Sequence, residues 1–442
     1  MKNSGVEWIG EIPEGWEVSR IKNFLSERTG GAWGDEKKNN ANDIICLRIA
    51  DFDYSRFKFN NSTELTIRNY NTDIIEKLLL KKDDILVEKS GGGDKTPVGR
   101  AVIFEKSYKA LFANFMDRLR VRNNISALFF LYVWTTYYDN KYMLPYVKQT
   151  TGIQNLDITS ILSGVFFPLP PKSTQQRIAT YLDKKCSKIE ETIQNQQQVI
   201  EKLKAYKQSL ITEAVTGKVK IANGKACGEY ESYKDSGVEW IGKIPSEWEV
   251  KKLKFSSQIM RGLFSHRPRN DPDYYDGVHP FIQTGEVARA VKYITTYSQT
   301  LNELGFSVSR EFPAGTVLLT IAANVGDVAI LDFNACFPDS VIGFYPKENV
   351  SKIFMFYVLK SMKEQFMRNA IISTQMNLNI NIVKEEFIPL PSLAEQKEIV
   401  KFLEKKSDYI DTAIEQKQNL IEKLTEYKKS LIYECVTGKK EI

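Results

Sequence analysis

The sequence is poor in the residues that metal sites and disulfide frameworks need. Its 442 residues include two histidines, His266 and His279, and only five cysteines. The cysteines are odd in number, scattered and without a CxxC pair: Cys46, Cys186, Cys227, Cys336 and Cys435. This pattern argues against a disulfide framework and a zinc site, and it is typical of a reducing compartment. We therefore expect no metal on this chain and a cytoplasmic location.

Long apolar segments are also missing. The N-terminal stretch MKNSGVEW has no apolar signal segment. The longest apolar run, ALFFLYVWTTYY at 127–138, is too short to span a bilayer. We interpret this run as a buried core helix of a globular domain.

No common catalytic motif is complete. The run SGGGDKTPVG at 90–99 fails the P-loop pattern because Lys89 and Asp94 stand where glycines are required. An NPPY-like tetrapeptide with a cofactor-binding glycine loop is absent, as are a PD…[DE]xK nuclease site and a GxSxG elbow. These absences favour a binding protein without a cofactor of its own over a stand-alone enzyme. The net charge of +6 permits a nucleic-acid partner without requiring one.

What the sequence does contain is a duplication of its own first half. SGVEWIGEIPEGWEV at 4–18 returns as SGVEWIGKIPSEWEV at 236–250, with twelve of fifteen positions identical. SLITEAVTGK at 209–218 likewise returns as SLIYECVTGK at 430–439. Weaker sequence similarities occur between these two repeated segments, in the same order in both halves. The chain therefore has the layout A-B-A′-B′ of a tandem repeat.

The two B segments predict two long helices with a coiled-coil seam. Apolar residues alternate at spacings of four and three, which is the 3.5-residue repeat of a coiled coil. Polar residues interrupt this seam at Gln196, Lys207, Lys417 and Lys428. Capping boxes at Ser173 and Ser392 and glycines at 217 and 438 mark the expected ends. The partner favoured by the seam is the other copy; a helix packed only on its own domain is the alternative.

The A segments predict two α+β globules of similar fold. We place domain boundaries at 1–167 and 236–388 for the globules, 168–219 and 389–442 for the helices, and 220–235 for a polar linker. The expected fold is therefore α+β, with two similar domains separated by two long antiparallel coiled-coil helices in a pseudo-twofold tandem repeat.

The first candidate DNA contacts are positions that correspond in the two halves of the repeat but carry different residue types. Arg48 aligns with Gln283, and arginine reads guanine in the major groove whereas glutamine reads adenine. The glycine loop offers backbone N–H groups at Gly91, Gly92 and Gly93 to phosphates, but a plain hairpin turn is an equal alternative. The basic side chains near this loop are Lys89, Lys95 and Arg100.

Further candidates are basic or amide-rich stretches that also suit a solvated surface. Arg118 and Arg120, with Arg122, alternate along an expected strand. The stretch RGLFSHRPRND concentrates Arg261, His266, Arg267 and Arg269. Asn324 lies in the turn that echoes the glycine loop, and amide side chains precede each long helix at Gln154, Gln375 and Asn377.

Together these motifs resemble the specificity subunit of type I restriction–modification systems. The resemblance rests on the repeated SGVEWIGxIPxxWEV, PLPxxxxQxxI and the heptad helix ending SLIxExVTGK, and it covers essentially the whole chain. It implies two target-recognition domains that each read one half of a bipartite double-stranded DNA site. It also implies a subunit with no active site that holds two S-adenosylmethionine-dependent adenine methyltransferase subunits. ATP- and Mg-dependent endonuclease subunits complete such assemblies.

An architectural DNA-binding or tethering protein with a coiled-coil spacer is the alternative function. It would share the helices but need no methyltransferase.

Overall fold

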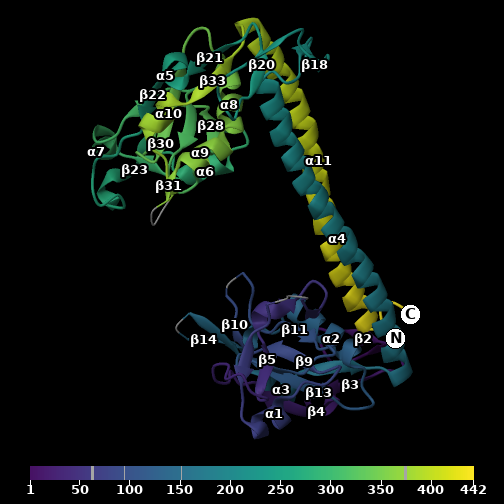
Figure 1. Ribbon diagram of the computed structural model, residues 1–442. Helices are drawn as coiled ribbons and strands as arrows, with labels where there is room; N and C mark the ends of the chain where they lie inside the picture. The colour runs from purple at the N-terminus through teal and green to yellow at the C-terminus, as the bar shows by residue number, and fades with distance from the viewer. Residues whose placement is uncertain (61–63, 94, 151, 373–375) are drawn as a thin grey trace. The chain divides into compact units, whose positions relative to one another are not determined.

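The computed structural model describes residues 1–60, 64–93, 95–150, 152–372 and 376–442 (Figure 1). The chain divides into two compact units. Unit 1 contains residues 1–198 and 417–442, and unit 2 contains residues 199–416. Each unit therefore combines a globular part with portions of both long helices.

The globular part of unit 1 is built on a four-stranded antiparallel sheet. Its strand order is β11(Ala101–Ile103)-β9(Ile85–Glu88)-β13(Met116–Val121)-β4(Leu25–Gly30). Helix α2 (Ala127–Asp139) packs on β11, and its N-cap Ser126 accepts a hydrogen bond from the Phe129 amide. Ten of its thirteen residues are buried, so the run at 127–138 is the core helix that the sequence predicts.

The other elements of unit 1 are short and complete this globule. A three-stranded sheet has the order β12(Ala110–Phe112)-β5(Asp43–Leu47)-β8(Ile67–Asn69). The remaining strands are β1(Lys2–Asn3), β2(Glu11–Ile12), β3(Glu17–Arg20), β6(Phe52–Asp53), β7(Lys58–Phe59), β10(Ser90–Gly91), β14(Val147–Thr150), β15(Ile153–Leu156) and β16(Phe166–Leu169). The short helices are η1(Ile21–Phe24), η2(Ile49–Asp51), α1(Thr72–Leu78), η3(Leu144–Tyr146) and α3(Ile158–Gly164).

Unit 2 repeats the same sheet. Its strand order is β22(Ser257–Arg261)-β30(Val341–Pro346)-β27(Val317–Thr320)-β28(Val328–Leu331)-β24(Tyr293–Ile294). The first four strands correspond in order to β4, β13, β9 and β11. Helix α8 (Lys352–Ser361) packs on β27 and β28 and is capped by Ser351, as Ser126 caps α2. The expectation of two similar α+β domains is thereby confirmed.

The remaining elements of unit 2 are equally short. Its other strands are β17(Ile221–Ala222), β18(Lys225–Ala226), β19(Tyr233–Asp235), β20(Lys243–Pro245), β21(Glu249–Lys252), β23(Tyr275–Pro280), β25(Thr300–Leu301), β26(Glu311–Phe312), β29(Ala335–Cys336), β31(Ile371–Ile372), β32(Met376–Asn377) and β33(Phe387–Leu390). Its short helices are α5(Leu253–Ser256), η4(Pro272–Tyr274), α6(Thr284–Arg289), α7(Glu303–Ser307), α9(Lys363–Asn369) and α10(Ile380–Glu385).

The two long helices are α4 (Lys172–Val215) and α11 (Leu393–Val436). Ser392 and Glu395 form the predicted capping box, with each backbone N–H donating to the other side chain. Ser173, by contrast, lies inside the first turn of α4, because the Pro171 carbonyl already accepts the first helical bond from Gln175. The expected box at Ser173 is therefore wrong.

Both long helices end in the same glycine motif. Gly217 and Gly438 adopt φ of +71° and +74°, the left-handed conformation that favours glycine. The amides of Lys218 and Lys439 then bond back to the carbonyls of Glu213 and Glu434 at 2.9 and 2.8 Å. These are Schellman ends, as the sequence predicts.

Within each unit the long helices pack antiparallel, and the polar seam residues pair with one another. In unit 1 the Lys428 ammonium lies 3.1 Å from the Glu190 carboxylate. In unit 2 the repeat-equivalent Lys207 lies 2.6 Å from Asp411. Lys417 donates to Gln196 at 3.1 Å, and these two residues are each other's equivalents in the repeat. The seam therefore carries the pseudo-twofold symmetry of the sequence.

The repeated opening, residues 4–18 and 236–250, holds the end of a long helix. In unit 1, Pro13 and Trp16 enclose Gly438 at the end of α11. In unit 2, Pro245 and Trp248 enclose Gly217 at the end of α4, where a Cβ atom would lie 2.4 Å from the proline ring. Each opening thus holds the helix encoded by the other half of the repeat. No helix in the described residues is long and apolar enough to cross a membrane.

The buried Lys428–Glu190 pair generates a stability prediction. Lys428→Met leaves the Glu190 carboxylate buried without its cation, which costs about 3–5 kcal/mol. We expect a lower urea midpoint for this variant. The double variant Lys428→Met/Glu190→Met should recover most of the loss, because an apolar pair of similar volume is often neutral. Lys423→Met on the exposed face of α11 is the matched control. A double variant no more stable than the single one would contradict this account.

Candidate nucleic-acid interface

One edge of unit 1 brings together most of the residues predicted around the glycine loop. The amides of Lys89 and Ser90 both donate to the Phe115 carbonyl, at 2.9 and 3.3 Å. Strand β10 pairs with β15, so that Gly91 faces Gln154. A Cβ atom at Gly91 would lie 3.9 Å from the Ile49 side chain, which follows Arg48. The glycine loop, β15 and Arg48 therefore share one edge.

The glycine loop is shaped by its own hydrogen bonds. Gly91 and Gly92 have φ of +129° and +67°, and a Cβ atom at Gly92 would meet the Val98 amide at 2.6 Å. The Gly93 amide donates to Thr96 at 3.0 Å. Gln154 is only 6% exposed, and its carbonyl oxygen accepts from the Val98 amide at 3.1 Å. Gln154 therefore holds the loop in shape rather than facing solvent.

Arg48 and Gln283 occupy equivalent places in the two units. Arg48 precedes η2, and its amide donates to Asp51 at 2.8 Å. Gln283 precedes α6, and its amide donates to Glu286 at 3.0 Å. Their side chains are also held, Arg48 by Asp51 at 3.2 Å and Gln283 by Gln299 at 2.9 Å. The sequence alignment of these two positions is matched by the backbone around them.

Exposed aromatic residues flank Arg48, and sequence analysis missed them. Trp33 is 42% and Phe115 50% exposed, and both line a hollow with Arg48 and Asn114. Arg68 lies over the Trp33 ring at 4.8 Å. Large exposed aromatics beside an arginine suit contact with the edges or faces of bases. The signal was present in the sequence, because each ring stands among polar or small neighbours in a loop.

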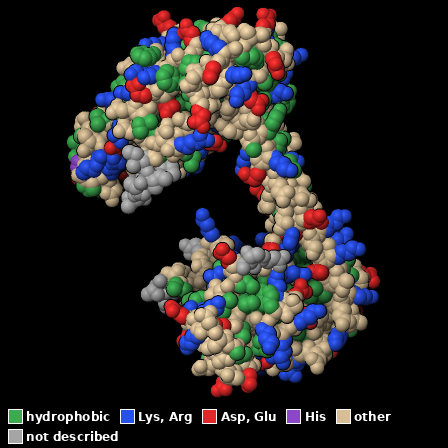
Figure 2. All heavy atoms as spheres, viewed as in Figure 1, with side chains coloured by type: hydrophobic (Ala, Val, Ile, Leu, Met, Phe, Trp, Pro, Cys, Tyr) green, Lys and Arg blue, Asp and Glu red, His purple; other side chains and the backbone are tan. Residues whose placement is uncertain are grey.

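Unit 2 concentrates arginines around one carboxylate. Arg269 pairs with Asp339, Arg267 lies 3.6 Å from it, and Arg261 donates to its backbone carbonyl. The side chains of Arg267 and Arg269 remain 52% and 46% exposed. One carboxylate cannot neutralise these cations, so the cluster is positive. Figure 2 shows basic side chains distributed over the visible face of both units.

His266 is fixed beside this cluster. Its Nε2 atom lies 3.0 Å from Asp271, and its ring stacks on Tyr274 at 3.8 Å. The amide candidates of unit 2 lie at a different edge. Asn377 bridges to Ala322 as Asn155 pairs with Ser90 in unit 1, and Asn324 is exposed in the neighbouring turn. Gln375 lies outside the described residues.

Of two predicted contacts on β13, Arg118 is buried and Arg120 is only partly exposed. Arg118 is 1% exposed, pairs with Glu27, and donates to the carbonyls of Lys77 and Leu79 at 3.1 Å. Arg120 pairs with Asp84 at 2.7 Å and with Glu27 at 2.6 Å. The structure corrects the expectation of a solvent-facing basic strand, because carboxylates from distant segments cover these guanidinium groups.

Burial opposes ionisation of Glu27, but the Thr29 hydroxyl and the two arginines hold its pKa below the usual value.

Two of the three remaining basic candidates of unit 1 are paired with carboxylates. Lys89 lies 2.9 Å from Asp117, and Arg100 lies 3.1 Å from the buried Glu88. Lys95 is exposed. Of these, Lys95 is the most accessible to a phosphate.

The family model of the type I restriction modification DNA specificity domain matches residues 13–205 and 245–424. The chain belongs to this family. As a specificity subunit of a type I restriction–modification system it is DNA-binding and non-catalytic. Within the described ranges, no group of three or more histidine, cysteine, aspartate or glutamate side chains is placed to hold a metal.

Curated relatives of this specificity subunit cover nearly its whole length. The putative type I restriction enzyme MjaX specificity subunit of Methanocaldococcus jannaschii is 28% identical over 415 residues, which is 91% of this chain and 89% of the relative. The EcoKI specificity subunit of Escherichia coli K12 is 23% identical over 426 residues, covering 91% and 84%. The relatives therefore share both halves of the duplication.

Solved structures show the same fold. A chain from work on complex assembly and conformational transition of the type I R-M system aligns with a TM-score of 0.72 at 14% identity, covering 97% of this chain and all of that one. The HsdS subunit from Thermoanaerobacter tengcongensis aligns with a TM-score of 0.50, also at 14% identity, covering 97% and 98%.

The different environments of Arg118 and Arg269 generate a paired prediction. Arg118→Ala should destabilise unit 1 by at least about 2 kcal/mol, because it leaves the carbonyls of Lys77 and Leu79 without their donor, at about 1–3 kcal/mol each. Arg269→Ala should leave the urea midpoint nearly unchanged. It should instead reduce the slope of log DNA affinity against log salt concentration by the amount that about one phosphate contact contributes. Urea unfolding and DNA titrations at several salt concentrations check both. Loss of stability in Arg269→Ala, or none in Arg118→Ala, would reverse the assignment.

Proposed function

We propose that this specificity subunit reads a bipartite double-stranded DNA site. Residues 1–167 and 236–388 act as two target-recognition domains, one for each half-site. The observation that supports this is the combination of one repeated sheet order with different residues at equivalent surface positions, above all Arg48 against Gln283. A repeated scaffold with divergent contacts suits two sequences read by one chain.

The chemistry of these positions suits direct readout. An arginine forms bidentate hydrogen bonds to guanine, and a glutamine does so to adenine. The carboxylates and amides that hold both side chains reduce the entropy lost on binding. Exposed Trp33 and Phe115 add apolar contact beside Arg48. The arginine cluster around Asp339 supplies phosphate contacts for the second domain.

The helices of residues 168–219 and 389–442 would serve as spacer and docking surface, with residues 220–235 as a linker. Tyr206 and Tyr427 are equivalent positions of the repeat and are 55% and 52% exposed. An exposed aromatic side chain at the same place on both helices suits two copies of one partner. That partner is an adenine methyltransferase subunit.

The chemistry of the assembly then lies on its partners. Two methyltransferase subunits bind S-adenosylmethionine, and two endonuclease subunits that use ATP and Mg complete the assembly. The complex acts in the cytoplasm. An architectural DNA-tethering role would leave genomic methylation unchanged when the gene is deleted.

Two substitutions test the reading of the site. Genome-wide mapping of N6-methyladenine, with and without this gene, first defines the methylated motif. Arg48→Ala should then relax one half of that motif only, and Gln283→Ala the other half only. Each lost bidentate contact reduces discrimination by about 1–3 kcal/mol. The two variants serve as controls for each other, since each must leave the opposite half-site intact. A motif unchanged by both would assign these positions to the scaffold.

A further inference from the structure

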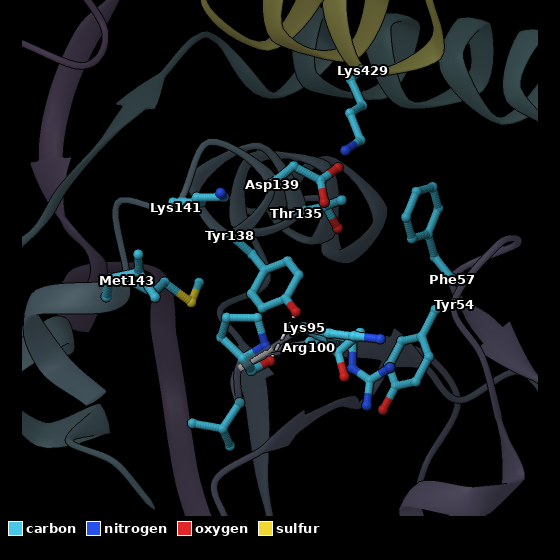
Figure 3. A pocket seen from close by; sticks show the side chains of 15 residues that line it. Tyr54, Phe57, Lys95, Arg100, Thr135, Tyr138, Asp139, Lys141, Met143 and Lys429 are labelled. Atoms are coloured by element: carbon cyan, nitrogen blue, oxygen red, sulfur yellow. Dashed lines mark hydrogen bonds between the residues drawn. The ribbon is translucent and has the colours of Figure 1, made fainter. Parts of the chain in front are cut away.

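Unit 1 contains a cavity behind the glycine loop (Figure 3). Its volume is about 310 Å³, at the lower end of the range for small-molecule sites. Its walls come from the segment after β6, the glycine loop, the C-terminal end of α2, and Lys429 of α11. All of these segments belong to unit 1.

The walls of the cavity are aromatic and held in place. Tyr54, Phe57 and Tyr138 line it. The Arg100 guanidinium stacks over the Tyr54 ring at 3.7 Å, and the Tyr138 hydroxyl donates to the Pro97 carbonyl at 2.8 Å. Phe57 packs edge-on against a ring of α2 at 5.7 Å. Rings fixed in this way offer a preorganised surface for a flat aromatic ligand.

The rim of the cavity is cationic. Lys95, Lys141 and Lys429 line it and are exposed, and in the described part of the chain none lies within 4 Å of a carboxylate. Figure 3 shows the Lys429 side chain directed toward the cavity from α11. Three ammonium groups against one carboxyl of the lining, Asp139, leave the rim with a net positive charge, which favours an anion.

One polar group on the wall suits the edge of a heterocyclic base. Burial raises the pKa of Asp139, although Lys429 and Lys428 lower it. A partly desolvated carboxyl gains from a ligand that carries a hydrogen-bond donor.

We propose that this cavity binds one nucleotide, with its base against the aromatic walls and its phosphate at Lys141 and Lys429. A flat heterocycle satisfies the rings, and a phosphate satisfies the rim. Neither inorganic phosphate nor a neutral aromatic compound satisfies both. The nucleotide is either free in solution or an extrahelical residue of bound DNA, and only the second source rests on the proposed function.

The site is not a by-product of the duplication. Helices α2 and α8 begin at equivalent serines, which aligns Thr135 and Tyr138 with Lys360 and Lys363 of unit 2. The position of Lys429 corresponds to Gln208. Unit 2 therefore has lysines in place of Thr135 and Tyr138, and an amide in place of one cation of the rim.

The test uses the purified full-length chain and isothermal titration calorimetry. The probes are the four 2′-deoxynucleoside 5′-monophosphates, with inorganic phosphate as the comparison ligand. We expect at least one monophosphate to bind one to one, and more tightly than phosphate. Lys141→Glu/Lys429→Glu should weaken it by at least about tenfold, since each lost charge-assisted contact is worth more than an ordinary hydrogen bond. Both positions are on the surface, so the fold should persist.

The matched control is Lys37→Glu/Lys423→Glu, which makes the same change of net charge in unit 1 away from the cavity. Equal weakening by both variants would overturn the proposal, as would no binding of any monophosphate or equal binding of phosphate. If one of these outcomes overturns the nucleotide proposal while the methylation motif is unaltered, the proposed function still holds. When binding is found, its displacement by a cognate duplex assigns the nucleotide to DNA, and simultaneous binding assigns it to the free pool.

Discussion

The antiparallel seam between α4 and α11 is the constraint on which each unit depends. Apolar residues alone would allow these helices to slide by a turn, because their 3.5-residue pattern repeats along the whole length. The buried Lys428–Glu190 pair in unit 1 and the Lys207–Asp411 pair in unit 2 remove that freedom. A shift of one turn would separate each lysine from its carboxylate, and in unit 1 it would leave both Lys428 and Glu190 buried without a partner. The polar interruptions of the seam therefore specify its register at some cost in stability.

The same register fixes the helix ends against the repeated openings. Gly438 fits between Pro13 and Trp16 only because its backbone is left-handed and carries no side chain. This explains why the opening and the VTGK ending are the best-preserved parts of the repeat, although they lie far apart in the sequence. They form one joint, made twice, and each copy of the opening closes on the helix of the other copy. A change in one of the two would have to be matched in the other.

Much of this architecture could be predicted because it is encoded in periodic and repeated features. The seam spacing, the terminal glycines and the internal repeat are local or self-evident patterns, and they gave the helices and the two similar domains. Arg118 and Arg120 show where such reasoning stops. Their alternation along β13 is the same for a solvent-facing strand and for one whose basic side is covered. The difference lies in Glu27 and Asp84, which reach these arginines from strands and turns that the sequence does not connect to them. The Ser173 cap failed for a smaller reason, since Pro171 already ends the extended segment and the helix starts two residues earlier than expected.

The two halves of the chain have thus diverged under two different constraints. Positions that face the seam or the helix-end joint are restrained by a partner within the chain, so Lys207 and Lys428 remain the same residue. Positions such as Arg48 and Gln283 share a backbone role, because the carboxylates of Asp51 and Glu286 bind their amides. Asp51 also holds the Arg48 side chain, whereas Gln299 holds the Gln283 side chain, so the two side chains have different supports on the same backbone. The cavity of unit 1 follows the same logic, since Tyr138 and Lys429 line a space that their counterparts in unit 2 are free to fill with other groups. Divergence therefore accumulates where the backbone supports a side chain but does not require it.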